Sequence, residues 1–120
     1  MDISAATTVL RLLGKTIRGI VVRSTDLAAR YGGEEFVILL PETGSQGALL
    51  VAEKIRTSVC GLNIPHDHSS VAKYVTASLG TATSRCTPGG SVTNIVAQAD
   101  QQLYAAKNTG RNRVCGVATV

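Results

Sequence analysis

The sequence predicts an α/β fold, an α+β sandwich in which helices flank a mostly antiparallel central sheet. Apolar residues recur at helical spacing in three segments, about 5–22, 43–61 and 92–107. The short segments between them are bounded by glycine or proline, which is typical of strands. The expected order is α-β-β-α-β-α-β in one domain, residues 1–120, which opens on a helix.

The first part of the chain combines a helix with a hairpin. Leucine and isoleucine at helical spacing predict an amphipathic helix over Ala5–Val22. Two strand-like segments, Asp26–Tyr31 and Glu34–Leu40, stand on either side of Gly32 and Gly33. Because glycine adopts the positive φ of a tight turn at little cost, this pair predicts a β-hairpin.

A second helix is expected from Thr43, as its N-cap, to about Gly61. Gln46 follows Thr43 by the spacing of a capping box, in which each side chain accepts from the other residue's backbone N–H. Apolar and hydroxyl residues alternate over Val75–Leu79, which predicts a half-buried strand.

The last part of the chain predicts a helix followed by a strand. Apolar residues at helical spacing extend over about 92–107, and Gly110 is a plausible C-terminal stop. A short strand over Val114–Val117 then closes the fold.

Composition narrows the classes of function. Lys and Arg number 12 against 8 Asp and Glu, a net charge of +4, which favours anionic ligands such as nucleotides. There is no block of Lys and Arg and no aromatic interleaving, so a nucleic-acid polymer is not an expected partner. No apolar run nears the roughly 20 residues of a membrane helix, and the N-terminus lacks the pattern of a signal peptide. We therefore expect a cytoplasmic protein with no membrane partner.

Cysteine and histidine give weaker indications. Cys60, Cys86 and Cys115 are far apart and show no C-x-x-C spacing, which favours free thiols in a reducing compartment. The segment 66–68 reads His-Asp-His in a polar loop. It could take part in a metal site, but no further ligand is near in sequence, so a solvated loop is the preferred interpretation.

The glycine pair and the acids after it form the strongest local signal. Bare glycines at Gly32 and Gly33 let a phosphate approach the backbone N–H groups. The carboxylates of Glu34 and Glu35 can hold Mg²⁺ against phosphate oxygens. On a regular strand these two side chains point to opposite faces, which predicts different roles for them. The alternative is an ordinary hairpin with solvated acids.

Four ordered blocks of sequence resemble the GGDEF domain, the bacterial diguanylate cyclase family. The hairpin block reads Arg-Tyr-Gly-Gly-Glu-Glu-Phe, and the others match the family's following helix, its Thr-x-Ser-x-Gly strand, and its C-terminal helix and turn. The four blocks occur in the family's order, and the resemblance covers about residues 9–116, which makes it specific. In chain order they are 30–36, 41–43 with 52–56, 75–80, and 99–112.

The resemblance implies an activity and a set of site residues. Members of the family condense two GTP into cyclic di-GMP, one GTP per domain, across a dimer. By resemblance, Gly32 and Gly33 lie against phosphate, Glu34 is a metal ligand for Mg²⁺, and Glu35 assists at the same catalytic site.

Two basic residues near the end of the third helix match those that contact the triphosphate in the family. Lys107 ends the helix and Arg111 follows its turn, so both can face one anion. The alternative is an ordinary helix end, where cations also suit the helix dipole.

A second motif resembles the family's inhibitory site, which binds a stacked dimer of cyclic di-GMP. Arg23 and Asp26 form an Arg-x-x-Asp, with five residues between Asp26 and Gly32. Arg23 would supply a planar fork to phosphate or a guanine edge, and Asp26 would accept from guanine N–H groups. Lys54 falls where members often carry a helical Arg, and Lys supplies the charge without the fork. The alternative is an Arg–Asp pair on an exposed turn.

The sequence departs from the family at its start. The family's opening strand, which carries an Asp metal ligand, is absent, and residues 2–7 do not match Gly-His-x-x-Gly-Asp. Before Asp26 the only acidic residue is Asp2, so we expect a weak, incomplete metal site at Glu34, with Mg²⁺ needed only if there is turnover. The uncovered sheet edge predicts a covering partner, with a homodimer expected.

These observations predict a degenerate GGDEF domain that binds cyclic di-GMP through Arg23 and Asp26 as a signalling receptor or regulatory module. The first alternative is a truncated piece of an active diguanylate cyclase. A further alternative is an interaction-only remnant that dimerises without nucleotide. GTP could still occupy the remnant of the active site in any of these cases.

Overall fold

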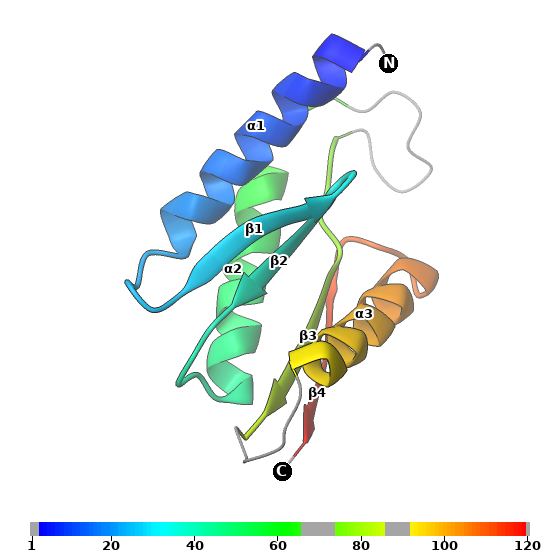
Figure 1. The fold of residues 1–120 in the computed structure, drawn as a ribbon. Coiled ribbons are helices and arrows are strands. Elements are labelled where there is room, and N and C mark those ends of the chain that lie inside the picture. Colours follow the sequence, from blue (N-terminus) through cyan, green and yellow to red (C-terminus); the bar gives the residue numbers. More distant parts are fainter. Residues whose placement is uncertain (1–2, 66–73, 86–91, 120) are drawn as a thin grey trace. The chain divides into compact units, whose positions relative to one another are not determined.

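The computed structural model describes residues 3–65, 74–85 and 92–119. The predicted α/β class and element order are confirmed (Figure 1). The chain divides into two compact units, Met1–Glu42 and Thr43–Val120. Asp2, the segment 66–68 and Cys86 lie outside the described residues. The elements are α1 (Ile3–Ile20), β1 (Leu27–Gly32), β2 (Glu35–Leu39), α2 (Ser45–Gly61), β3 (Leu79–Ser84), α3 (Val92–Asn108) and β4 (Val114–Thr119).

The first unit contains α1 and the predicted antiparallel hairpin of β1 and β2. Arg30 pairs with Phe36 and Gly32 with Glu35, with a register irregularity between Arg30 and Gly32. Gly32 has φ +151° and Gly33 has φ +52°, backbone conformations that favour glycine. The turn itself is Gly33 and Glu34, so Glu34 stands on the turn and not on a regular strand. The expectation that the two glutamates alternate along one strand is therefore wrong.

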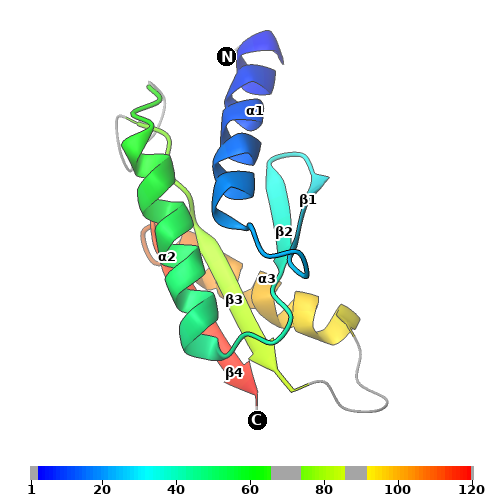
Figure 2. The same ribbon diagram turned by 90° about the vertical axis from the view of Figure 1, so that its left-hand side faces the viewer.

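The second unit sets β3 and β4 side by side, with α2 on one face and α3 on the other (Figures 1 and 2). A Cβ on Gly80 would meet the backbone of α3 at 2.2 Å, whereas a Cβ on Gly116 would lie 3.1 Å from Leu49 of α2. The bare backbone of Gly80 therefore allows α3 to pack directly on β3.

The pairing of β3 with β4 is parallel, so the expectation of a mostly antiparallel sheet holds for the hairpin but not here. The physical reason is the connection. The chain leaves the end of β3, returns through α3 and re-enters beside the start of β3, which is a β-α-β crossover. Among the described residues, the two strand pairs form two separate two-stranded sheets.

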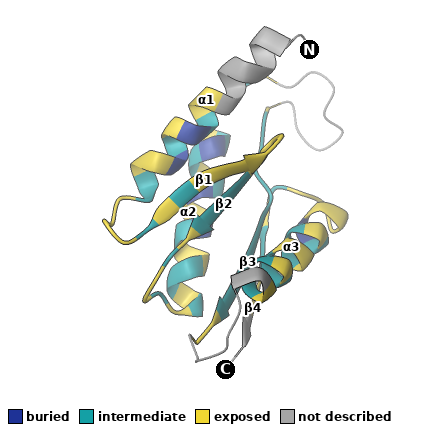
Figure 3. Ribbon diagram, in the orientation of Figure 1, coloured by how far each residue is buried: buried dark blue, intermediate teal, exposed yellow. Residues whose placement is uncertain are grey.

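Buried apolar residues are few and lie mainly on helices (Figure 3). Ala52, Ile55 and Val59 follow one another at the predicted helical spacing on α2, with exposures of 4%, 3% and 2%. Ala106 of α3 is fully buried, and Ile17 is buried on α1. The hairpin contributes no fully buried residue.

Two local predictions are wrong by a few residues. The N-cap of α2 is Gly44, with φ −76° and ψ 173° and no side-chain cap hydrogen bond, so the N-cap expected at Thr43, with its capping box to Gln46, is wrong by one residue. The strand expected over Val75–Leu79 forms its ladder only from Leu79 onward. Alternation marks an extended backbone, but a ladder also needs a neighbouring strand, and β4 begins opposite Leu79.

No helix in the described part of the chain has the length and apolar character needed to cross a membrane.

Candidate functional site

Arg23 and Asp26 meet in the turn between α1 and β1. Arg23 Nε donates to Asp26 Oδ2 at 2.9 Å, and Nη2 donates to Oδ1 at 2.7 Å, which makes a bidentate ion pair. Nη2 also donates to the carbonyl of Pro41 at 3.1 Å, and the N–H of Asp26 donates to the carbonyl of Arg23 at 3.0 Å. The turn therefore fixes the orientation of the guanidinium before any ligand arrives.

The two partners of this pair differ in exposure. The side chain of Arg23 is 48% exposed, whereas that of Asp26 is 5% exposed. The hydrogen bonds from Arg23 hold the pKa of Asp26 below its ordinary value, and the same bonds raise the pKa of Arg23. The pair favours the ionised form of Asp26, and its solvent-exposed partner is the guanidinium of Arg23.

The glycine turn offers open space beside its backbone. A Cβ on Gly32 or Gly33 would meet nothing within 4 Å, so these glycines are required by their φ angles and leave room for a bound group. Arg30 Nε donates to the carbonyl of Gly33 at 2.9 Å, which fixes the turn from one side. Glu34 and Glu35 are both exposed.

The turn offers two carboxylates to a metal ion. Carboxylate oxygens are ligands that Mg²⁺ prefers, so Glu34 and Glu35 suit it by type. Within residues 3–65, 74–85 and 92–119, however, no three His, Cys, Asp or Glu side chains gather closely enough to hold a metal ion. The donor set that these residues offer at the turn is therefore a partial one.

Lys107 and Arg111 lie at the end of α3 and in the turn after it. Lys107 is in the last turn of the helix, and both residues are exposed. Gly110 has φ +129° and ends the helix as predicted. Arg111 has φ +62°, and its N–H donates to the carbonyl of Ala106 at 2.9 Å. The two cations therefore share one helix end.

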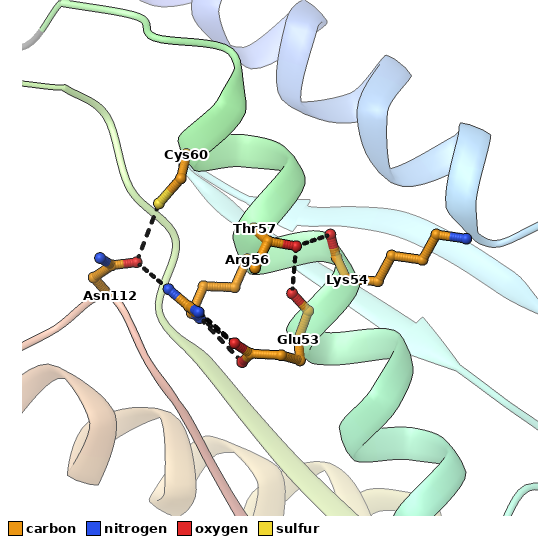
Figure 4. Close-up of polar contacts among 6 residues, drawn as sticks. All are labelled: Glu53, Lys54, Arg56, Thr57, Cys60 and Asn112. Carbon is orange, nitrogen blue, oxygen red and sulfur yellow. Dashed lines mark hydrogen bonds and ion pairs between the residues drawn. The ribbon is translucent and has the colours of Figure 1, made fainter.

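A hydrogen-bond network centred on Arg56 holds this turn, and sequence reasoning missed it (Figure 4). Arg56 Nε donates to both carboxylate oxygens of Glu53 at 3.0 Å, and its Nη1 donates to Asn112 Oδ1 at 3.0 Å. Cys60 Sγ donates to the same oxygen at 3.4 Å. The N–H of Asn112 donates to Ser78 Oγ at 3.2 Å. The residue directly after Arg111 is therefore tied to α2.

The ion pair between Arg56 and Glu53 has electrostatic consequences like those of the first pair. The hydrogen bonds from Arg56 lower the pKa of Glu53, and those bonds raise the pKa of Arg56. One sequence feature could have indicated the tight turn at Asn112. Asn tolerates positive φ, and this Asn follows Gly110 and Arg111; in the structure Asn112 has φ +46°.

Lys54 follows Glu53 on α2, and its backbone carbonyl accepts a hydrogen bond from Thr57 Oγ1 at 3.2 Å (Figure 4). Its side chain is exposed and extends away from the side chain of Arg56 (Figure 4). The structure thus brings Arg23 to Asp26, places the glycines and glutamates on one hairpin, and places Lys107 and Arg111 at one helix end. Lys54, Lys107 and Arg111 belong to the second unit, and the other predicted site residues belong to the first.

Comparison with known proteins identifies the family of this chain. Residues 4–113 match the family described as diguanylate cyclase, GGDEF domain. The chain belongs to the GGDEF domain family. It is 40% identical over 97 residues to the response regulator PleD of Caulobacter vibrioides, covering 81% of this chain and 21% of PleD. The chain thus spans about a fifth of that relative's length.

Solved GGDEF structures share the fold. The GGDEF domain of DgcB from Caulobacter crescentus, in complex with c-di-GMP, matches with a TM-score of 0.76 at 32% identity, over 91% of this chain and 63% of that one. The active GGEEF domain of a diguanylate cyclase from Vibrio cholerae matches with a TM-score of 0.68 at 28% identity, over 95% of this chain and 69% of that one.

Proposed function

We propose that this GGDEF domain binds cyclic di-GMP through Arg23 and Asp26 and acts as a signalling receptor or regulatory module. The observation that carries the proposal is the exposed, oriented guanidinium of Arg23, 48% exposed and held by two hydrogen bonds to Asp26. Because its orientation is fixed in the free protein, less conformational entropy is lost when an anion binds.

The chemistry of the pair suits this ligand. Cyclic di-GMP carries phosphate anions and guanine edges, and both accept hydrogen bonds from a guanidinium. Because Nε and Nη2 of Arg23 already donate to Asp26 and Pro41, the ligand would contact the exposed part of this group or displace one of those acceptors. Asp26 would accept from guanine N–H groups with the lone pairs that Arg23 does not use, and because its side chain is 5% exposed the ligand would have to uncover it. The structure of the DgcB GGDEF domain in complex with c-di-GMP supports the choice of ligand, since that domain shares the fold and 32% of the sequence.

A second candidate is a piece of an active diguanylate cyclase that condenses two GTP into cyclic di-GMP. It is supported by the Gly-Gly-Glu-Glu-Phe turn of this chain and by its likeness to the active GGEEF domain from Vibrio cholerae. In that role Gly32 and Gly33 would contact phosphate, Lys107 and Arg111 would bind the triphosphate, and Glu34 with Glu35 would hold Mg²⁺. The bound ion would neutralise charge on the phosphates.

The proposed setting is the cytoplasm, and the proposed assembly is a homodimer. Two domains would each contribute one ligand-binding face, so that a stacked pair of cyclic di-GMP molecules could bridge them. Sedimentation of the chain with and without cyclic di-GMP tests this: we expect the dimer fraction to rise with ligand, and a ligand-independent monomer would contradict it.

Calorimetric titration with cyclic di-GMP tests the main proposal. We expect the wild-type chain to bind, and Arg23→Ala to weaken binding by at least about a hundredfold because a charge-assisted fork is lost. Arg85→Ala, which removes an exposed arginine elsewhere, is the matched control and should stay within about twofold of the wild type.

Two further measurements separate the candidates. Wild-type affinity in Arg23→Ala would contradict the receptor proposal. Product formed from GTP with Mg²⁺, and abolished by Glu34→Ala, would establish the second candidate.

A further inference from the structure

A cavity of about 370 Å³ lies within the first unit, between α1 and the hairpin. Three arginines line it: Arg11 and Arg18 of α1, and Arg30 of β1. Ile17 and Phe36 supply an apolar wall. None of the lining residues carries a carboxylate, so the arginine cavity, as we name it, is cationic and partly apolar.

Gly14 opens this cavity on the helix side. Gly14 is buried, and a Cβ there would lie 3.6 Å from Arg18 Nη1 and 3.7 Å from Phe36 Cε1. The guanidinium of Arg18 and the edge of the Phe36 ring therefore face one small volume beside bare helix backbone. A longer side chain at position 14 would fill that volume.

Two of the three arginines around the cavity, Arg11 and Arg18, lack a partner within the described residues, whereas Arg30 Nε donates to the carbonyl of Gly33 at 2.9 Å. Arg11 and Arg18 stand seven residues apart, which places them on the same face of α1. Within the described residues, neither makes a hydrogen bond or an ion pair. Over Ile3–Ile20, α1 carries Arg11, Lys15 and Arg18 and no acidic residue. Guanidinium groups gathered in this way repel one another, and a bound anion would relieve the repulsion.

We infer that the arginine cavity binds a small organic oxyanion, a phosphate ester or a carboxylate, with an aromatic body against Phe36. Guanidinium groups pair with phosphate and carboxylate through parallel N–H donors. A volume of about 370 Å³ leaves room for an organic body beside the oxyanion. The cavity shares no residue with the Arg23–Asp26 pair, so this site is additional to the proposed cyclic di-GMP site.

Titration of the full chain by NMR tests the inference with three probes: phenyl phosphate, benzoate and inorganic phosphate. We expect phenyl phosphate to shift the Arg18 Nε–H and Phe36 ring signals and to bind at least about threefold more tightly than inorganic phosphate, because its ring buries apolar surface. The tighter of phenyl phosphate and benzoate identifies the oxyanion class. Equal affinity for phenyl phosphate and inorganic phosphate, or no shift of these signals with any probe, overturns the inference.

Matched variants separate a built site from general attraction to a basic helix. Arg18→Gln should raise the Kd for the tighter aromatic probe at least about tenfold, whereas Lys15→Gln removes the same charge from α1 outside the cavity and should stay within about twofold. Equal effects of the two variants would overturn the inference.

A third variant blocks the cavity itself. Gly14→Leu should abolish binding of the aromatic probe while leaving cyclic di-GMP affinity unchanged, and if it does not fold, Arg18→Gln carries the test alone. Loss of cyclic di-GMP binding in Arg23→Ala with probe binding retained would show that the two sites succeed or fail separately.

Discussion

Two arginine–carboxylate pairs in this chain share a spacing of three residues and differ in which partner faces solvent. In the turn before β1, the side chain of Arg23 is 48% exposed and that of Asp26 is 5% exposed. On α2, the side chain of Arg56 is 22% exposed and that of Glu53 is 49% exposed. The first pair presents its cation outward, where a ligand can reach it. The second turns its cation inward, where it binds Asn112 and holds a turn.

The difference shows that an arginine–acid spacing alone does not indicate a role. The second partner of the guanidinium, beyond its carboxylate, makes the difference. Arg23 donates to the backbone carbonyl of Pro41, and about half of its side chain remains in solvent. Arg56 instead donates to the side chain of Asn112, on another segment of the chain. The variants below test whether the outward pair serves binding and the inward pair serves stability.

The largest expected effect comes from removing the outward cation in two ways. Arg23→Ala should lose affinity for cyclic di-GMP and should also lower the melting temperature, because it leaves the covered carboxylate of Asp26 without this cation. Adding Asp26→Asn to Arg23→Ala should restore most of the melting temperature but none of the ligand affinity. Thermal melts and calorimetry on the single and double variants measure this, and recovery of binding in the double variant would contradict it.

For the inward pair, we expect a loss of stability without a loss of ligand affinity. Arg56→Ala removes the hydrogen bond to Asn112 and the alkyl packing of the arginine, and should lower the free energy of unfolding by about 1–3 kcal/mol. Affinity for cyclic di-GMP should stay within about twofold of the wild type. Urea denaturation and calorimetry check both halves. A large loss of affinity with unchanged stability would reverse the roles assigned to the two pairs.

Variants of Asn112 test how the turn that Arg56 holds is stabilised. Asn112→Gly loses the side-chain hydrogen bonds but still adopts the positive φ easily. Asn112→Ala loses the same hydrogen bonds and is also strained at this φ, so it should be less stable than the Gly variant by about 1 kcal/mol. Denaturation of the two variants side by side isolates the backbone contribution. Equal stabilities would mean that the turn does not depend on the φ of residue 112.

The smallest expected effect is on acid stability. Arg23 lowers the pKa of Asp26 and Arg56 lowers that of Glu53, so each carboxylate stabilises the fold fully above its unfolded pKa. That contribution is lost as the pH falls from about 4 through the lower folded value. Asp26→Asn and Glu53→Gln should each flatten the fall in unfolding free energy below about pH 4. If the unfolding free energy of a variant fell with pH in parallel with that of the wild type, the ion pair removed in that variant would not contribute to acid stability.

Features that depend on neighbours along the chain could be predicted from the amino-acid sequence. The element order followed from apolar periodicity, and the glycine turn followed from the need for positive φ at Gly32 and Gly33. The helix end at Gly110 followed from the same property. The spacing of Arg23 and Asp26 likewise indicated a local pair, and the two side chains do meet.

Features that depend on segments distant in sequence could not be predicted, because they arise from packing. The parallel pairing of β3 and β4, the start of the ladder at Leu79, the bond from Arg56 to Asn112 and the arginine cavity each require two such segments to pack together. Periodicity records which residues share a face of one element, but not which other element covers that face. The direction in which each arginine points is therefore a property of the packed fold.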